Sequence, residues 1–373
     1  MQQPIRILQG VNIMDRAGLE SMLMNYYRNI DRERVQFDFL THRSQKGAFE
    51  DEILELGGNV YHAPRLYIHN LPTYRKYMQE LFSKHNEYRI MHSHIDAMSY
   101  FTLREAKRND IPIRIAHSHS SKLDYDLKLP IKYYALRSIK RVANFNCACG
   151  KVAGEFMFDD SDFRVIRNAI DLDKYAYNEE KRATVRKQLG IENQFVIGHV
   201  GRFCYIKNQL FLLEVFKEIL KYQKDSLLLL IGKGPDEKQI IDKAVELGIR
   251  DKVLLLIDRK DVDILYQAMD VFVMPSLFEG LPVVGVEAQA NGLHCIISDS
   301  VSKEIKLSTS IKQIPLNGGV KVWADEILNS EKLRNIKAKQ ELQSAGYDIK
   351  IEAKKLQQWY EELYGSAMND EKA

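Results

Sequence analysis

The sequence contains few cysteines and no arrangement of them that suggests a metal site or a redox pair. Four cysteines occur in 373 residues, and no two are spaced as C-x-x-C. Such a set supplies neither a vicinal dithiol nor the regular ligand spacing of a structural zinc site. We therefore expect reduced thiols, as in a cytoplasmic protein.

Long apolar segments and a charge excess are also absent. The longest apolar runs, such as Leu227–Ile231, have the length of a strand, well below the roughly 20 residues of a membrane span. The first residues enter a strand-like run, Ile5–Leu8, without the basic head and apolar core of a signal peptide. With 54 basic and 51 acidic residues, the net charge is +3, which excludes bulk nucleic-acid binding. We expect no secretion, no membrane crossing and no nucleic-acid partner.

The chain has the size and composition of two soluble domains. At roughly 150 residues per domain, 373 residues favour two units over one. Hydrophobic residues make up 45% of the chain and charged residues 28%, so each half can bury a core.

Short apolar runs alternate with segments of helical period, which is typical of parallel sheets with crossover helices. In the first half we expect strands at 5–11, 35–41, 88–94, 113–118, 144–149 and 163–167, and helices near 18–30, 72–85, 97–109, 130–142 and 151–157. In the second half we expect strands at 195–201, 227–231, 253–257, 271–274 and 295–298, and helices at 208–222, 237–247, 262–269 and 283–290.

The pattern predicts an α/β protein of two Rossmann-like, doubly wound domains that face a cleft, since ligands of such sheets lie beyond the carboxyl ends of the strands. We expect an N-terminal domain at 1–180 and a C-terminal domain at 181–348. A final helix at 349–365 has apolar residues at near-helical spacing and is expected to pack across the lobes. The tail 366–373 is small and charged, and we expect it to be disordered.

A basic motif follows the first strand of the second half. Gly201-Arg202-Phe203 ends that strand, and Lys207-Asn208 opens the next helix. A guanidinium, an ammonium and a helix N-terminus together favour a diphosphate. A solvated basic pair beside a glycine turn is the alternative.

A glycine turn, Gly232-Lys233-Gly234-Pro235, follows the next strand. Its glycines allow close approach of the backbone to a ligand, and Pro235 suits the start of a helix. It is not a dinucleotide fingerprint, because Glu237 occupies the position of the third glycine. A plain tight turn explains it equally well.

Two carboxylates flank the start of the helix near 283–290. Glu279 lies in the loop Phe278-Glu279-Gly280-Leu281-Pro282, and Glu287 follows about a turn and a half into the helix. Ionised carboxylates accept hydrogen bonds from vicinal hydroxyls, so the pair suits sugar recognition. The alternative is that Glu279 caps the helix and Glu287 faces solvent.

Two H-x-H elements end strands of the first half: His92 with His94, and His117 with His119. Alternation along a strand puts His117 and His119 on one face. Nothing in the pattern fixes a carboxylate ligand, so we expect no metal, and we favour His119 as an imidazole near a sugar hydroxyl.

The stretch 127–154 carries six basic residues and no acidic one, with Tyr133, Tyr134 and Phe145 interleaved. It could bind an anionic membrane surface peripherally. A solvated helix face explains the charges almost as well.

Six motifs in this order resemble the retaining GT-B glycosyltransferases of family 4, especially bacterial enzymes that build capsular and exopolysaccharide. The resemblance spans nearly the whole chain, and six ordered matches are far more specific than any one. The motifs are Ala17-Gly18-Leu19-Glu20, His117-Ser118-His119, Asn168-Ala169-Ile170-Asp171, Gly201-Arg202-Phe203 with Lys207-Asn208, Gly232-Lys233-Gly234-Pro235, and Pro275 to Pro282 continuing through Glu287-Ala288.

The resemblance implies roles for these residues. Arg202 and Lys207 would hold the donor diphosphate, Glu279 would contact the transferred sugar, Glu287 would bind the ribose hydroxyls, and His119 would lie by the sugar. The expected catalytic set is Glu279, His119, Arg202 and Lys207. The expected donor-binding set is Gly18, Gly201, Arg202, Lys207, Gly232, Gly234, Arg259, Glu279, Gly280, Leu281, Pro282 and Glu287.

The implied activity is transfer, with retention of anomeric configuration, of a hexose or N-acetylhexosamine from a nucleotide diphosphate sugar. UDP is the family's commonest nucleotide, and no metal or other cofactor is normally required. The acceptor would be lipid-linked or a polysaccharide, reached in the cytoplasm or on the inner face of the membrane. A noncatalytic nucleotide-sugar-binding partner subunit and a GT-B nucleotide-sugar epimerase are the alternatives.

Three residues depart from the family pattern. Ile257 replaces a common glycine before the nucleobase loop, Gly285 replaces a bulkier apolar residue, and His294 replaces a common proline. None is a charged site residue, but Ile257 leaves the path of the loop 258–261 open.

Overall fold

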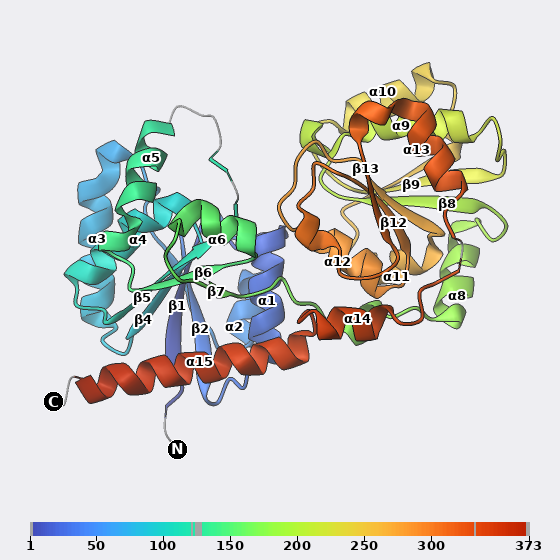
Figure 1. The fold of residues 1–373 in the computed structure, drawn as a ribbon. Helices are drawn as coiled ribbons and strands as arrows, with labels where there is room; N and C mark the ends of the chain where they lie inside the picture. The colour runs from blue at the N-terminus through green and yellow to red at the C-terminus, as the bar shows by residue number, and fades with distance from the viewer. Residues whose placement is uncertain (1–2, 121, 124–128, 332, 371–373) are drawn as a thin grey trace. The chain divides into compact units, whose positions relative to one another are not determined.

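The chain folds into two compact units. The structure, a computed structural model, describes residues 3–120, 122–123, 129–331 and 333–370. Unit 1 comprises Met1–Ala169 and Ile349–Ala373, and unit 2 comprises Ile170–Asp348 (Figure 1). The predicted boundary at 180/181 is too late, because Ile170 and Leu172 are already buried in the core of unit 2. The backbone N–H of Ile170 also donates to the carbonyl of Tyr347, 3.0 Å away, where the chain leaves unit 2.

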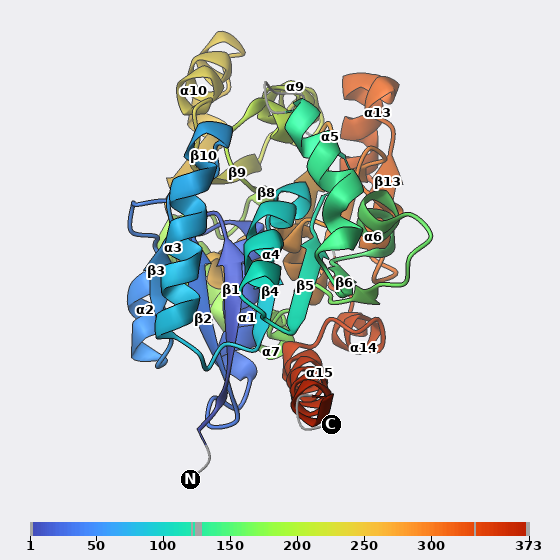
Figure 2. The same ribbon diagram turned by 90° about the vertical axis from the view of Figure 1, so that its left-hand side faces the viewer.

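Unit 1 contains a seven-stranded parallel sheet with the strand order β3-β2-β1-β4-β5-β6-β7. Figure 2 shows this order from β3 to β6. The strands are β1 (Ile5–Val11), β2 (Val35–Thr41), β3 (Val60–His62), β4 (Ile90–Ser93), β5 (Ile113–Ser118), β6 (Phe145–Ala148) and β7 (Arg164–Val165). The order reverses at β1, so β1 and β4 are neighbours and their carboxyl ends lie at a topological switch point.

Helices cover both faces of this sheet. They are α1 (Gly18–Asn29), α2 (Glu50–Glu55), α3 (Leu71–Lys84), α4 (Ser99–Arg108), α5 (Leu129–Ser138), α6 (Lys151–Phe158) and α15 (Ile349–Asp370). Alternate residues of each strand face opposite layers. Ile7 packs with α1 and α15, whereas its neighbour Leu8 packs with α3 and α4.

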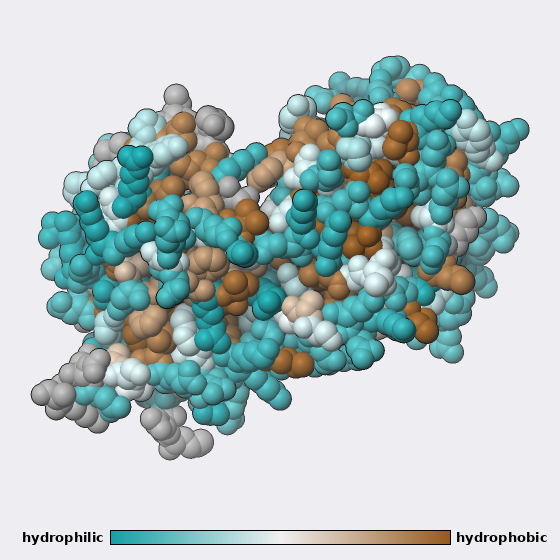
Figure 3. Space-filling view, in the orientation of Figure 1, coloured by the Kyte–Doolittle hydropathy of each residue, from teal (hydrophilic) through white to brown (hydrophobic). Residues whose placement is uncertain are grey.

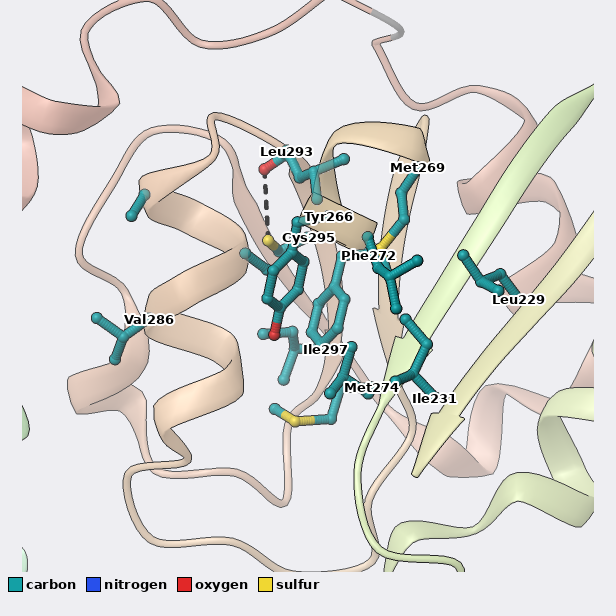
Figure 4. Close-up of a cluster of buried hydrophobic side chains, with 14 of the residues drawn as sticks. Leu229, Ile231, Tyr266, Met269, Phe272, Met274, Val286, Leu293, Cys295 and Ile297 are labelled. Atoms are coloured by element: carbon teal, nitrogen blue, oxygen red, sulfur yellow. Dashed lines mark hydrogen bonds between the residues drawn. The ribbon is translucent and has the colours of Figure 1, made fainter. Parts of the chain in front are cut away.

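Unit 2 contains a six-stranded parallel sheet with the order β10-β9-β8-β11-β12-β13. Its strands are β8 (Phe195–Val200), β9 (Ser226–Gly232), β10 (Val253–Ile257), β11 (Val271–Met274), β12 (His294–Ser298) and β13 (Ile311–Ile314). Its helices are α7 (Leu172–Tyr175), α8 (Glu179–Leu189), α9 (Gln209–Ile219), α10 (Glu237–Glu246), α11 (Val262–Ala268), α12 (Val283–Ala290), α13 (Gly319–Leu328) and α14 (Ala338–Ser344). Figure 4 shows part of its core, where Tyr266 and Phe272 lie among side chains of β9, β11 and β12.

The two predicted parallel sheets are confirmed, whereas the tail is not as expected. Residues 366–370 continue α15 instead of being disordered, and 371–373 lie outside the described residues. The helix packs on unit 1 through Ile349, Ala353, Leu356 and Tyr360. Its apolar face therefore continues the core made by α1 and β2.

None of the helices in the described ranges combines the length and the apolar character that a membrane span requires. On the face shown in Figure 3, hydrophilic and hydrophobic residues are interspersed.

Candidate active site

The basic motif lies in the loop that follows β8. Gly201, Arg202 and Phe203 leave the strand, and the short 3-10 helix η4 (Tyr205–Lys207) leads to Asn208. Asn208 has a φ of 57°, a left-handed conformation that asparagine tolerates, and α9 begins one residue later. Arg202 is exposed, and its guanidinium has no partner in the described parts of the chain. It is therefore available to an anion.

The loop after β8 is tied to the loop after β11. The backbone N–H of Leu277 donates to the carbonyl of Ile206 at 2.8 Å. The side-chain amide of Asn208 donates to the carbonyl of Pro275 at 3.1 Å. These two bonds place Lys207 against Glu279.

The ammonium of Lys207 forms an ion pair with the carboxylate of Glu279. Their side chains are only 16% and 18% exposed, so the pair is largely shielded from solvent. The structure thus brings together Lys207 and Glu279, two predicted site residues of opposite charge. A diphosphate that binds Lys207 would compete with Glu279 and leave that carboxylate free to accept hydroxyl protons.

The two alternatives considered for the carboxylates are both wrong. The residue that precedes α12 is Pro282, and within the part of the chain that the structure describes no side chain makes a capping hydrogen bond to this helix, so Glu279 is not a cap. Glu287 does not face solvent, because each of its carboxylate oxygens accepts a hydrogen bond from a tyrosine. In the loop between them, Leu281 is buried in the core of unit 2.

Two tyrosines hold Glu287. The hydroxyl of Tyr175 on α7 donates to one oxygen at 2.8 Å, and the hydroxyl of Tyr266 on α11 donates to the other at 2.9 Å. Burial raises the pKa of Glu287, and the two tyrosine hydrogen bonds oppose that rise. Sequence reasoning missed both tyrosines, because Tyr175 lies outside the quoted motifs, between the strands predicted at 163–167 and 195–201, and the ring of Tyr266 is a core residue (Figure 4).

Close packing explains why Gly232 and Gly234, in the turn after β9, are glycines. A Cβ at Gly232 would lie 2.0 Å from the carbonyl oxygen of Gly201, and one at Gly234 would lie 2.1 Å from that of Phe203. The N–H of Phe203 also donates to the carbonyl of Lys233 at 3.0 Å. The turn is therefore packed directly against the Arg202 loop and supports it.

The loop after β10 is organised by charge pairs. Arg259 makes a bidentate contact with Asp261, at 2.7 and 2.5 Å, and Lys233 lies 3.1 Å from Asp258. The guanidinium lowers the pKa of the Asp261 carboxyl. Arg259 is thus engaged within its own loop, while Ile257 at the strand end is 39% exposed.

Of the other two departures from the family pattern, Gly285 has a local explanation. A Cβ at Gly285 would lie 3.1 Å from the Cδ1 atom of Ile305, so a larger side chain would have to displace this neighbour. His294 begins β12, with its Nε2 atom 3.5 Å from Glu331.

In unit 1, Gly18 begins α1 and is exposed, as a loop contact with phosphate requires. Two residues further, Glu20 is only 7% exposed. Burial raises its pKa from 4.5 to about 7, and the nearby Asp15 adds to the rise.

The four strand-end histidines form one stack at the carboxyl ends of β4 and β5. The rings of His92 and His94 lie 4.2 Å apart, those of His117 and His119 lie 4.1 Å apart, and hydrogen bonds link the two pairs. The prediction that His117 and His119 share a face is confirmed. Burial lowers the pKa of all four imidazoles, that of His119 to about 3, so they are neutral near pH 7.

Three of these rings meet the distance requirement for a metal site. Within the described residues, His92, His94 and His117 each offer a nitrogen within 4.8 Å of the other two. However, the nitrogens of His92 and His117 that face each other are joined by a hydrogen bond of 3.1 Å, so they are already paired with one another. Both nitrogens of His92 and of His94, and Nδ1 of His117, make hydrogen bonds, so the cluster fits a polar network better than a metal centre.

The basic stretch predicted to reach a membrane lies only partly in the described residues, since 127–128 fall outside them. Within α5, Tyr133 and Tyr134 are more than half exposed, and Arg137 lies over the ring of Tyr133 at 5.8 Å.

The class of protein follows from the site and the comparisons together. Residues 181–305, which contain Arg202, Lys207, Glu279 and Glu287, match the family described as Glycosyl transferases group 1. The two parallel-sheet units have the GT-B architecture. Together with a glycosyltransferase that is 34% identical over 92% of this chain, this match shows that the chain belongs to the group 1 glycosyltransferases.

The chain is 34% identical over 356 residues to the putative glycosyltransferase EpsF of Bacillus subtilis strain 168, covering 92% of this chain and 93% of that protein. It is 29% identical over 228 residues to the UDP-Gal:alpha-D-GlcNAc-diphosphoundecaprenol alpha-1,3-galactosyltransferase of Escherichia coli, covering 58% of this chain and 59% of that enzyme. The structure of Anabaena Alr3699/HepE in complex with UDP superposes with a TM-score of 0.77 at 17% identity, over 96% of this chain and 100% of that chain.

Proposed function

We propose that this protein transfers a hexose or N-acetylhexosamine, with retention of configuration, from a UDP sugar to a lipid-linked or polysaccharide acceptor in capsule or exopolysaccharide synthesis. The proposal is supported by the resemblance to EpsF, by a relative whose name specifies UDP-Gal and a diphosphoundecaprenol acceptor, and by a structural neighbour that binds UDP.

The observation that carries the proposal is the Lys207–Glu279 ion pair beside the unpaired Arg202. The pair is preorganised by the bonds between its two loops, so both charges are in place before substrate binds. When a diphosphate takes over Lys207, Glu279 loses its counter-charge and can accept hydrogen bonds from sugar hydroxyls. One event therefore assembles the diphosphate contact and the sugar contact.

The reaction would proceed on one face of the donor sugar. The bond between the anomeric carbon and the diphosphate breaks, and the acceptor oxygen bonds to that carbon on the same face. The acceptor proton passes to the departing diphosphate. Arg202 and Lys207 stabilise the negative charge that develops on the leaving group, which is their main contribution to the rate.

Glu287 is proposed to accept hydrogen bonds from the ribose hydroxyls. The tyrosines use one lone pair of each of its oxygens and leave others for a ligand. They also hold the carboxylate in one orientation, which reduces the entropy lost on binding.

We propose that no resident metal takes part. Arg202 and Lys207 supply the positive charge that a divalent cation supplies elsewhere, and five of the six ring nitrogens of His92, His94 and His117 make hydrogen bonds.

The acceptor is proposed to be reached at the cytoplasmic face of the membrane. The exposed aromatic side chains of α5, next to basic residues, support peripheral contact with anionic lipid. Salt-sensitive cosedimentation with anionic vesicles, absent with neutral vesicles, is the expected result, and salt-independent behaviour would remove this part of the proposal.

A thermal-shift screen of nucleotide sugars tests the donor site. A ligand at 100 times its Kd stabilises the folded protein by about 2.7 kcal/mol, so the true donor raises the transition temperature measurably. We expect Arg202→Ala to abolish most of this shift. Lys238→Ala, which removes an exposed cation from α10, is the matched control and should retain it.

Product analysis separates the alternatives. A noncatalytic subunit would show the thermal shift but no turnover over a broad acceptor panel. An epimerase would release a free altered sugar nucleotide and no glycoside.

A further inference from the structure

Gln9 on β1 connects two chains of buried hydrogen bonds in unit 1. Its side-chain Oε1 lies 2.8 Å from Nε2 of His94, and its Nε2 lies 3.4 Å from the hydroxyl of Tyr360 on α15. Gln9 is fully buried and sits opposite His92 in the β1–β4 ladder. β1, β4 and β5 are consecutive in the sheet (Figure 2), so the amide lies beside the histidine stack.

The first chain runs from Gln9 towards His117, in the direction that gives the hydroxyl proton of Tyr360 an acceptor. The amide N–H of Gln9 donates to the oxygen of Tyr360, so the hydroxyl proton of Tyr360 goes to Nδ1 of His92, 2.7 Å away. His92 then carries its proton on Nε2 and donates it to Nδ1 of His117 at 3.1 Å. His117 Nε2 is left as a buried N–H without a partner among the described residues.

The second chain runs from His119 towards Gln9. Because Oε1 of Gln9 can only accept, His94 carries its proton on Nε2. Nδ1 of His94 is therefore an acceptor, and it receives the Nε2 proton of His119 at 3.0 Å. Nδ1 of His119 is then unprotonated, and it has no partner among the described residues.

The His119 ring is also fixed in place. Its backbone N–H donates to Oδ1 of Asp96 at 2.6 Å, and its ring stacks on His117. Half-buried at the end of β5, it presents one acceptor nitrogen and no ring N–H of its own to a ligand.

We infer that Gln9 and His94 are positioning residues which hold His119 as the Nε2–H tautomer, so that its Nδ1 accepts a hydrogen bond from a hydroxyl of the transferred sugar. The inference rests on the proposed function for the identity of the ligand. It explains why two polar residues that cannot touch a ligand are buried behind His119. It also assigns a preference: the sugar position that faces His119 must carry a hydrogen-bond donor.

The test compares donor analogues in two variants. His94→Phe removes both hydrogen bonds of the second chain, whereas Tyr360→Phe removes a hydroxyl from the first chain and leaves the His94–His119 bond in place. The readout is the ratio of kcat/KM for the parent UDP sugar to that for each monodeoxy analogue. A general structural defect lowers kcat/KM for the parent sugar and for the analogue by the same factor, so the ratio of the two values is unchanged.

In the wild type, kcat/KM for the deoxy analogue that lacks the hydroxyl facing His119 is expected to be about tenfold lower than for the parent sugar, the equivalent of one hydrogen bond of about 1.4 kcal/mol. In His94→Phe the ratio for that analogue falls to within twofold of unity, and in Tyr360→Phe it stays near tenfold. Analogues that lack a hydroxyl bound by Glu279 are discriminated too, but their ratios do not depend on His94. If every discriminated ratio survives in His94→Phe, or if the wild type discriminates no analogue, the inference is overturned.

Imidazole ¹⁵N NMR of the wild-type protein supplies a test that needs no variant and no substrate. All four histidines of the stack are expected as Nε2–H tautomers. A His119 signal from the Nδ1–H tautomer overturns the inference even if transfer is observed. If no nucleotide sugar is bound or transferred, the proposed function fails instead, and the NMR result still decides the tautomer.

Discussion

The buried carboxyl of Glu20, at the start of α1, makes a quantitative prediction about pH and stability. Its pKa is raised from 4.5 to about 7 by burial. A difference of about 2.5 between the folded and unfolded values corresponds to roughly 3 kcal/mol. Between these two values the folded chain binds more protons than the unfolded chain, so stability falls as the pH rises. The full cost of the charge is reached above pH 7.

Replacing Glu20 with Gln should therefore stabilise unit 1 at high pH only. At pH 8 the free energy of unfolding of Glu20→Gln should exceed that of wild type by up to about 3 kcal/mol, whereas at pH 4 the two should agree within about 0.5 kcal/mol. Urea unfolding is followed by tryptophan fluorescence in a Trp323→Phe background. The remaining tryptophan, Trp359 on α15, then reports on unit 1 alone. Glu33→Gln, at an exposed position, is the control. An equal effect of Glu20→Gln at both pH values would refute the reasoning.

Three further predictions concern unit 2. Lys207→Met and Glu279→Gln should each lower kcat/KM at least tenfold. Since the pair acts as a unit, the double variant should lose less than the product of the two single-variant losses. Multiplicative losses in steady-state kinetics would contradict this. Gly234→Ala should cost roughly 1–3 kcal/mol in urea unfolding, because its Cβ would lie 2.1 Å from a backbone oxygen, and an unchanged midpoint would show that the turn relaxes freely. Tyr266→Phe removes a hydrogen bond that orients the carboxylate of Glu287 and lowers its pKa. Calorimetry should therefore find donor binding weakened about threefold to tenfold at pH 7. If the variant binds the donor as tightly as the wild type, Tyr266 does not have the proposed orienting role.

The sequence predicts both sheets because buried parallel strands are continuous apolar runs, as at Leu227–Ile231 in β9. It misses the strands β3 and β13, which lie at the edges of their sheets. Val60–His62 has only three residues, none of them fully buried, and Ile311–Ile314 interleaves Lys and Gln with its isoleucines. Edge strands bury less side-chain surface, so their apolar signal is weak.

For the site, the sequence predicts the charged residues but not how they are held. Lys207 and Glu279 are both identified by motif, yet their ion pair depends on tertiary hydrogen bonds between two loops. Tyr175 and Gln9 have ordinary surroundings in the sequence, and their importance comes from partners far along the chain. The glycine turn illustrates the reverse: a motif predicted to approach a ligand has a close backbone contact with the neighbouring loop.

The most direct test of the central claim is a transfer assay with the donor found by thermal shift, followed by NMR of the product. The account predicts release of nucleoside diphosphate together with a glycoside whose anomeric configuration matches that of the donor. It also predicts that Arg202→Ala and Glu279→Ala each reduce the rate at least tenfold, while Lys238→Ala does not. Donor binding without turnover across a broad acceptor panel, or full activity in both site variants, would contradict the assignment of Arg202, Lys207 and Glu279 as the donor site.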